Sequence, residues 1–506
     1  MKRRLAIIAL LSAMTAGALA NDFIYRLHLT DKDGSTVCAL TERAMQRRER
    51  QSIAIDSADF CIPSRYLEAL ANEGWQIVTR SRWLNTVVVR RADGEAIAAE
   101  AFAAMPFIGR VEQIGGEIGA LANVSRIAPA AARNKLEMSE KTFSADDTDD
   151  FRRPIVELHG DMLHAAGFRG EGMLIAVLDG GFNNLPQWDF LHGKVVGWHD
   201  CYAREDKLGV ELFNASAHGT QVLSCMATDT TYGVWGTAPE ARYYVIRTEY
   251  GPSETPLEED MWVEGAELAD SIGADLINSS LGYSDFDDTT YSHTWSQLAQ
   301  NETQISRGAT LATKKGILVC SAAGNERAKE WQKISFPADV ASVMTVGATD
   351  IEQAPSAFTS VGWTTPYVKP DVACRGTLAW IIDPASGQPA CSSGTSFSAP
   401  TMCGLLASLW SANPALSAAE LCQIVRESAS NFATPDSLSG YGLPDFAVAL
   451  AKANPEAVIG GIMAHGERMP SADGTTHHDL LGRPIGHDAR GVILIGQKGR
   501  KTLLVR

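Results

Sequence analysis

The chain has 506 residues, of which 45% are hydrophobic and 8% aromatic. This length favours two or three domains, and the composition is that of a soluble protein with a sizeable core. The formal net charge of −16 at pH 7 argues against a nucleic-acid partner, because phosphate binding needs clustered lysines and arginines.

Residues 1–20 have the pattern of a secretory signal peptide. Basic residues at positions 2–4 precede a short apolar run that ends in Ala-Leu-Ala at positions 18–20, as in a signal with an A-x-A cleavage site. We expect cleavage after Ala20 and export from a bacterial cytoplasm. A retained membrane anchor is the alternative, but the run is short, and no other stretch is long and apolar enough to span a bilayer.

Residues 21–119 show the pattern of a small α+β domain. The expected strands are residues 23–29, 86–89 and 107–112, and the expected helices are residues 40–51 and 63–73. Residues 120–150 carry little periodic signal and end in a polar, acidic stretch, which is typical of an exposed linker.

The nine cysteines are an odd number for an exported chain, so at least one of them lacks an internal partner. Cys38 and Cys61 could bridge each other. Four others lie in apolar runs and are interpreted as core thiols: Cys225, Cys320, Cys403 and Cys422. No cysteine pair has metal-ligand spacing, so no zinc site is predicted.

Residues 151–455 alternate apolar runs with helical patterns. The expected strands are residues 173–178, 243–246, 276–278, 317–320 and 342–346, and the expected helices are residues 218–228, 256–272, 306–315 and 396–410. This alternation predicts an α/β fold, a mostly parallel sheet with helices on both faces. Functional sites in such sheets collect at the carboxyl ends of the strands, where Asp179 and the segments 278–282 and 322–325 fall.

Residues 391–410, CSSGTSFSAPTMCGLLASLW, are a small-residue turn that leads into an apolar helix. Ser396 is expected at the helix start, and Pro400 is expected in the first turn, where proline is tolerated. A serine there has a backbone N–H without a helical partner and lies at the positive end of the helix dipole. Both properties favour a nucleophile and its oxyanion, although such a serine alone is more often only a helix cap.

Three further segments supply the partners that a catalytic serine needs. Asp179 ends a strand before two glycines, His218 opens a helix, and Asn325 lies in a turn after a strand. The serine needs a base, the base needs an orienting carboxylate, and the oxyanion needs hydrogen-bond donors. The chain order Asp, His, Ser is one of three known for such triads.

Residues 151–454 resemble the subtilisin-like serine peptidases, and three motifs carry the likeness: Asp179-Gly180-Gly181, His218-Gly219-Thr220 and the GTSFSAP sequence at 394–400. The resemblance implies an endopeptidase that cleaves peptide or protein substrates through an acyl-enzyme. In that family Asp179 would orient the general base His218, Ser396 would be the nucleophile, and Asn325 would bind the oxyanion.

The same resemblance assigns a substrate-binding wall. Ser280, Leu281 and Gly282 match the strand that pairs with the substrate backbone, and Ala323 and Gly324 are placed in the same site. The resemblance implies no required cofactor, although structural calcium is an open option. We expect a monomer.

The match has two departures, and a rival interpretation remains. Gly180 stands where the family usually has Ser or Thr, and Gln221 where it often has His or a small residue, which puts the rate in doubt. The alternative is a weak or inactive subtilase-fold protein that binds peptides, but the four intact catalytic residues count against it. An esterase would usually show a G-x-S-x-G motif and the order Ser, Asp, His.

Residues 23–114 also resemble the propeptide of such peptidases, which would act as an intramolecular inhibitor; a separate binding domain is the alternative. Residues 456–506 are expected to form short strands at 479–483, 491–495 and 502–505. They resemble C-terminal sorting tails of exported Gram-negative proteins, and the alternative is a hairpin that caps the preceding domain. We therefore expect a secreted or cell-envelope protein of a Gram-negative bacterium.

Residues 249–288 contain twelve acids and no Lys or Arg. The simpler interpretation is a solvated helix face with a loop. The alternatives are an acidic rim on the substrate cleft, or oxygen ligands for calcium. His477 and His478 are interpreted as solvated surface, so no metal site is predicted.

Overall fold

The structure is a computed structural model that describes residues 23–91, 102, 104–115, 153–188, 191, 193–202, 212–229, 234–251 and 253–456, with four strands between residues 477 and 505. The expected signal peptide and the linker at 120–150 lie outside these residues. Among the described helices, none has the length and apolar character needed to cross a membrane.

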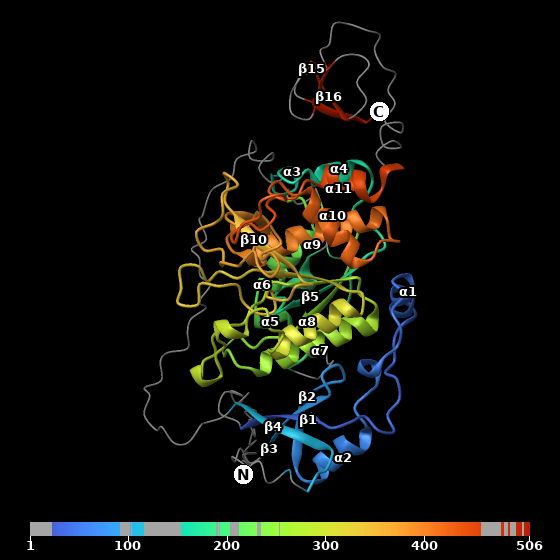
Figure 1. The fold of residues 1–506 in the computed structure, drawn as a ribbon, viewed down its shortest axis with the longest axis vertical. Coiled ribbons are helices and arrows are strands. Elements are labelled where there is room, and N and C mark those ends of the chain that lie inside the picture. The colour runs from blue at the N-terminus through green and yellow to red at the C-terminus, as the bar shows by residue number, and fades with distance from the viewer. Residues whose placement is uncertain are drawn as a thin grey trace, which may run out of the picture.

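A seven-stranded sheet forms the centre of the main region, which comprises residues 153–456 (Figure 1). Its strands lie in the order β11 (Val372–Arg375), β10 (Met344–Thr349), β9 (Leu318–Ala322), β8 (Leu276–Ser279), β5 (Leu174–Asp179), β7 (Arg242–Arg247) and β6 (Val195–Asp200). All neighbouring pairs are parallel. The predicted α/β class is therefore confirmed.

Helices cover both faces of this sheet, which explains why β5 is apolar along its whole length. Ile175 and Val177 belong to the apolar cluster that contains the helices α6 and α9. Leu174 and Ala176 point to the other face, into the cluster of α7 and α8. The long helices are α6 (His218–Ala227), α7 (Leu257–Ile272), α8 (Gln304–Lys314), α9 (Thr395–Ala412), α10 (Ala418–Ser428) and α11 (Phe446–Ala453).

Shorter elements complete the main region. They are α3 (Arg153–Val156), α4 (Gly160–Ala165), α5 (Leu212–Ala215) and the antiparallel hairpin of β12 (Ala379–Ile382) and β13 (Pro389–Ser392). Toward the C-terminus, a separate sheet contains β14 (His477–Asp479), β15 (Pro484–Ile485), β16 (Val492–Gln497) and β17 (Arg500–Val505). The first strand expected there, at 479–483, was therefore wrong in its bounds.

The N-terminal region, residues 23–115, is a four-stranded antiparallel sheet with two helices. Its elements are β1 (Ile24–Leu29), α1 (Glu42–Arg50), α2 (Ser64–Asn72), β2 (Trp75–Ser81), β3 (Thr86–Arg91) and β4 (Ile108–Gly115). Leu27 and Val87 pack with α2 on one face. Ile24 and Val88 on the other face share an apolar cluster with α7 and α8 of the main region.

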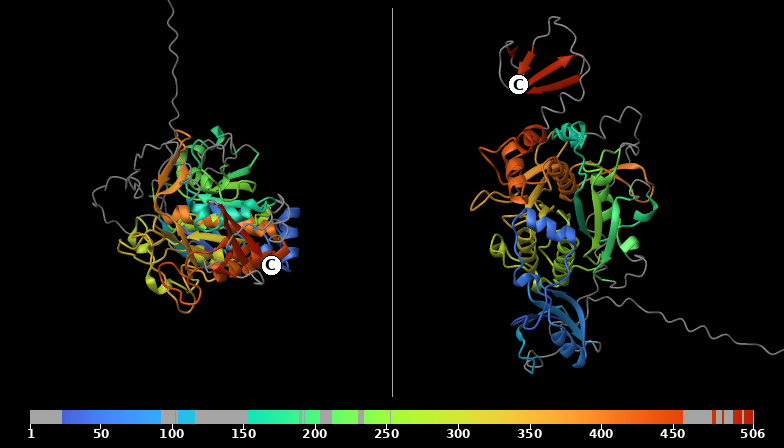
Figure 2. Two further views of the ribbon diagram at one scale, coloured as in Figure 1. Left: turned by 90° about the horizontal axis from the view of Figure 1, so that it is seen from above. Right: turned by 90° about the vertical axis from the view of Figure 1, so that its right-hand side faces the viewer.

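Residues 30–63, which we call the N-terminal arm, leave this sheet and carry α1 along the main region (Figure 2). Cys38 and Cys61 form a disulfide near the two ends of the arm, as the sequence allowed. Thr41 caps α1 by accepting a hydrogen bond from the N–H of Ala44. The four cysteines interpreted as core thiols are all buried and free.

The acids of α7 do not form a solvated face, so the simpler interpretation of residues 249–288 was wrong for this helix. Asp260 is 3% exposed and binds Arg26 of β1 at 3.0 Å. Asp270 is fully buried and binds Arg47 and Arg48 of the arm. These arginines lie more than 200 residues away in the chain, so a local pattern could not reveal the pairing.

Candidate active site

Asp179 and His218 come together at the carboxyl end of β5. Asp179 is the last residue of that strand and is fully buried, whereas His218 opens α6 with its side chain 28% exposed. The two carboxylate oxygens lie 2.9 and 3.0 Å from Nδ1 of His218. Because an ionised carboxylate only accepts hydrogen bonds, Nδ1 carries the proton, and Nε2 is left as the basic nitrogen.

The surroundings of His218 stabilise its charged form. Burial lowers the pKa of His218, but the attraction and hydrogen bond of Asp179, together with the charge of Glu249, outweigh this and raise the pKa above 6.5. An imidazolium that forms during a reaction is therefore favoured at this position.

Ser396 is the second residue of α9, and only 7% of it is exposed. Its N–H lies in the first helical turn, where no intrahelical acceptor exists. Its hydroxyl donates to the carbonyl of Ser280 at 3.3 Å. The ring of the next residue, Phe397, lies 5.9 Å from the His218 ring between centroids, so the starts of α6 and α9 meet here.

Pro400 was expected in the first turn of the helix, but this expectation was wrong. It is the sixth residue of α9. Proline has no N–H, so it cannot donate to the carbonyl of Ser396 four residues earlier. The hydroxyl of Ser280 takes that place and donates to the Ser396 carbonyl at 2.8 Å. The helix tolerates this proline close to Ser396 because a neighbouring strand end supplies the missing donor.

Asn325 is anchored to the start of α9 by one end of its amide. Its Oδ1 accepts hydrogen bonds from the N–H of Thr395 at 2.9 Å and from the Thr395 hydroxyl at 3.1 Å. Because both partners donate, they fix which end of the amide faces the helix. The Nδ2 donor therefore points away from Thr395 and lies beside Gly394, where a β-carbon would be 3.5 Å from it.

The residues expected to bind substrate lie at the ends of β8 and β9. Ser280 and Leu281 are buried, whereas Gly282 is exposed. The N–H and C=O of Ala323 bond to Val346 and Ser335, and those of Gly324 bond to Thr395 and Ser360. The N–H groups of Ala323 and Gly324 are thus both taken, and each of their carbonyls already accepts one hydrogen bond.

Sequence reasoning missed Glu249 as a neighbour of Asp179. It lies just after β7, the strand beside β5, so the carboxyl ends of the two strands bring it to Asp179. Its Oε1 accepts a hydrogen bond from the Tyr283 hydroxyl at 3.0 Å. The approach of Glu249 to Asp179 depends on the strand order, which no local sequence pattern contains.

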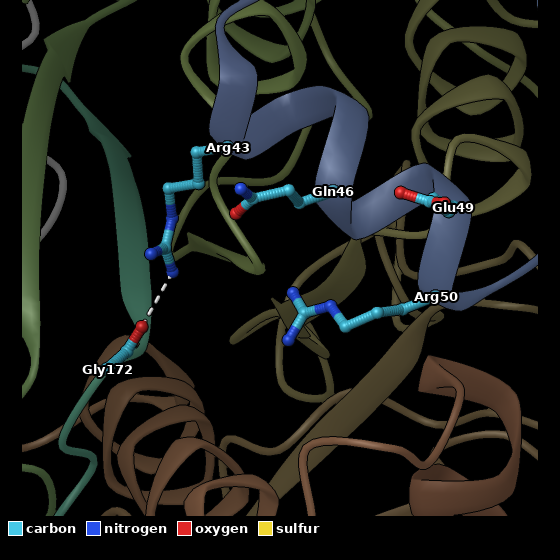
Figure 3. Close-up of a pocket in the computed structure, with 5 residues that line it drawn as sticks. All are labelled: Arg43, Gln46, Glu49, Arg50 and Gly172. Atoms are coloured by element: carbon cyan, nitrogen blue, oxygen red, sulfur yellow. Dashed lines mark hydrogen bonds between the residues drawn. The ribbon is translucent and has the colours of Figure 1, made fainter.

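Two other features lie away from these residues. Among the described residues, one group has metal-ligand chemistry: His199, Cys201 and Glu264, whose ligand atoms lie within 4.8 Å of one another. Each already has a protein partner, since Glu264 binds His199 and Thr79, and Cys201 donates to Met261. A pocket of about 340 Å³ between α1 and Gly172 contains none of the catalytic candidates (Figure 3).

Comparison with known proteins shows the family of the chain. Residues 170–442 match the subtilase family, and residues 25–127 match the peptidase S8 propeptide domain of Bacteroidota. The first match covers more than half of the chain, so the chain belongs to the subtilase family, a family of serine endopeptidases. The predicted family and the propeptide resemblance are confirmed; the sorting-tail resemblance stays a prediction.

Several curated relatives are subtilisins. Subtilisin DY of Bacillus licheniformis is 28% identical over 278 residues, which span 54% of this chain and 89% of that protein. Subtilisin BL of Lederbergia lenta is 27% identical over 281 residues, which span 55% and 91%. Among solved structures, the prenylagaramide maturation protease PagA is 20% identical with a TM-score of 0.47, over 58% of this chain and 98% of that one.

Proposed function

We propose that this protein is an exported serine endopeptidase in which Asp179, His218 and Ser396 act as a catalytic triad. The observation that carries the proposal is the contact of both Asp179 oxygens with Nδ1 of His218, at the point where the buried helix start with Ser396 meets α6. This arrangement leaves Nε2 of His218 as a base at the start of α6, and the start of α9, which it meets, carries the Ser396 hydroxyl.

The reaction would proceed in two halves. His218 Nε2 takes the Ser396 proton as Oγ attacks the peptide carbonyl, and the oxyanion accepts hydrogen bonds from the Ser396 N–H and Asn325 Nδ2. His218 then gives the proton to the leaving amine, which leaves an acyl-enzyme on Oγ. Water, deprotonated by His218, attacks the acyl carbon, and the proton returns to Ser396 as the acid product departs. These steps need no cofactor.

The N-terminal region would serve as an intramolecular inhibitor. Its match to the propeptide domain and its buried ion pairs with α7 support this role. We further propose secretion or a cell-envelope location in a Gram-negative bacterium, and this rests on the signal-like residues 1–20 and the tail sequence.

A serine-directed fluorophosphonate followed by peptide mapping tests this function. We expect labelling at Ser396, no labelling of the Ser396→Ala protein, and strongly reduced labelling of His218→Ala, because the hydroxyl then has no base. The same preparations should be assayed on an unfolded protein substrate. A folded wild-type protein that takes up no label and cleaves no substrate would instead indicate the peptide-binding alternative.

A further inference from the structure

We propose that Glu249 is a positioning residue of the catalytic centre, a second carboxylate that acts on the charge of His218 from beside Asp179. The inference rests on the proposed function and names a device by which that same site is tuned. It depends on three observations: where the backbone places Glu249, what fills the space over Gly180, and which charged groups surround the carboxylate.

The backbone ties Glu249 to the catalytic carboxylate. Asp179 and Arg247 are paired residues of the neighbouring parallel strands β5 and β7. The next N–H after β7, that of Thr248, donates to the carbonyl of Asp179 at 3.0 Å. Glu249 follows directly, so its position relative to Asp179 is set by the sheet.

The side chain of Glu249 occupies the space that a residue at position 180 would need. Its Oε1 is held by the Tyr283 hydroxyl. A β-carbon added to Gly180 would lie 3.3 Å from Oε2 of Glu249, closer than ordinary packing allows. Gly180, which departs from the Ser or Thr that the resemblance led us to expect, thus leaves room for the second carboxylate.

His218 is the group whose charge complements Glu249. The groups that act on Glu249 are Asp179, Tyr283 and His218, and Glu249 in turn acts on Glu258 of α7 and on Tyr202 after β6. The nearby guanidinium of Arg247 binds the carboxylate of Asp200 at 3.0 Å and reaches Glu249 only at its backbone carbonyl.

These surroundings make Glu249 titrate near neutrality. Burial, together with the charge of Asp179, raises the pKa of Glu249 to about 7, although Tyr283 and His218 act in the opposite direction. Above that pH two carboxylates favour the imidazolium of His218, and below it only Asp179 does. The positive charge that His218 gains in the transition state is therefore better stabilised as Glu249 ionises.

The Glu249→Gln variant tests this coupling in the processed enzyme. Because the neutral amide no longer favours the imidazolium, the acid limb of kcat/KM should move to lower pH by about 0.5 to 1 unit. For the same reason kcat on the alkaline plateau should fall about three- to tenfold. Rates are referred to the concentration of sites that react with a fluorophosphonate, so unfolded protein does not count.

Stability separates this role from a structural one. The folded-state pKa of Glu249 lies above the unfolded value of 4.5, so the ionised form is the less stable one, and stability falls as the pH rises from 4.5 through about 7. In the Ser396→Ala background, Glu249→Gln should therefore melt at the same or a higher temperature at pH 8, and the gain should vanish below about pH 4.5.

Tyr283→Phe is the matched second variant. The hydroxyl of Tyr283 lowers the pKa of Glu249. Loss of this hydroxyl should therefore move the Glu249-dependent rise in kcat to higher pH and leave kcat on the alkaline plateau unchanged. Adding it to Glu249→Gln should change nothing further.

An acid limb of Glu249→Gln that superimposes on that of the wild type would overturn the proposal. Lower activity with an unchanged limb and a lower melting temperature would do so as well, because it would show a purely structural role. A wild-type protein without label at Ser396 would instead contradict the proposed function itself.

Discussion

Asn325 bonds to two groups at once if the site works as proposed. Its Oδ1 holds Thr395 at the start of α9, and its Nδ2 is the donor left for the oxyanion. We expect Asn325→Ala to lower kcat about a hundred- to a thousandfold, the range known for removal of the oxyanion-binding asparagine of subtilisin. KM should change little, because the donor acts on the transition state.

A matched variant distinguishes the donor from the anchor. Asn325→Asp keeps an oxygen that can accept from Thr395 but has no N–H for the oxyanion. If the loss in Asn325→Ala came from a loosened helix start, Asn325→Asp would restore activity. We expect that it does not, and recovery to near wild-type kcat would contradict the oxyanion role.

Ser280 and Pro400 should be energetically coupled through the Ser396 carbonyl. Ser280→Ala leaves that buried carbonyl without its donor, and we expect it to cost about 1 kcal/mol in the free energy of unfolding. In a Pro400→Ala background, residue 400 regains an N–H that can donate to the same carbonyl, so Ser280→Ala should cost clearly less. Urea unfolding of the four proteins in a double-mutant cycle measures the coupling, and strict additivity would refute it.

The catalytic candidates could be predicted from sequence because each lies in a local motif. Asp179, His218 and Ser396 stand beside glycines or at element ends, where a single chain segment reveals their position. The exchange of hydrogen bonds between Ser280 and Ser396 spans 116 residues. That contact, like the approach of Glu249 to Asp179, depends on strand order, which no local pattern contains.

At the scale of elements, the strands that the sequence revealed are those that form apolar runs, whereas the short buried strand β11 was missed. β5 is buried on both faces and gives an unbroken apolar run. β6 is an edge strand, two of its six residues are exposed, and it carries Gly197 and the exposed Trp198. Its pattern was missed. α7 was placed almost correctly, but its acidic face was not understood, because its partners lie in the N-terminal region.

The pairing of α7 with the N-terminal region predicts that two arginines of α1 contribute unequally to the free energy of unfolding. Arg47 is fully buried, binds Asp270, and donates to the carbonyls of Ala274 and Lys315. In the uncleavable Ser396→Ala protein, Arg47→Met should lower the free energy of unfolding by about 3 kcal/mol, since it breaks a buried pair.

Arg43→Met is the control for this prediction. Arg43 is 38% exposed, and its partner Asp275 also binds Arg50, so its loss should cost less than about 1 kcal/mol. Urea unfolding of both variants makes the comparison. If the two variants lost the same free energy of unfolding, the arm would be held by its apolar contacts and not by the buried arginine.

For the whole molecule, the N-terminal region is built into the fold of the main region. Ile24, Val88 and Ile114 share an apolar cluster with Trp262 of α7, and the arm adds buried ion pairs along the same helix. Lys315 of the main region is 1% exposed and binds Asp56 and Asp59 of the arm. None of these contacts needs an intact chain between the two regions.

We expect the uncleaved chain to mature by its own activity. Because the contacts between the two regions do not need an intact chain, the N-terminal region should stay bound afterwards. We expect the enzyme to cut between about residues 115 and 151, because the acidic, polar sequence there has the composition of an exposed linker. The Ser396→Ala protein, purified without other proteases, should stay at the size expected from Asn21 onward. The two wild-type fragments should elute together in size-exclusion chromatography, since the buried ion pairs and the shared apolar cluster outlast the cut. If Ser396→Ala were processed at the same point as the wild type, another protease would be the one that cuts.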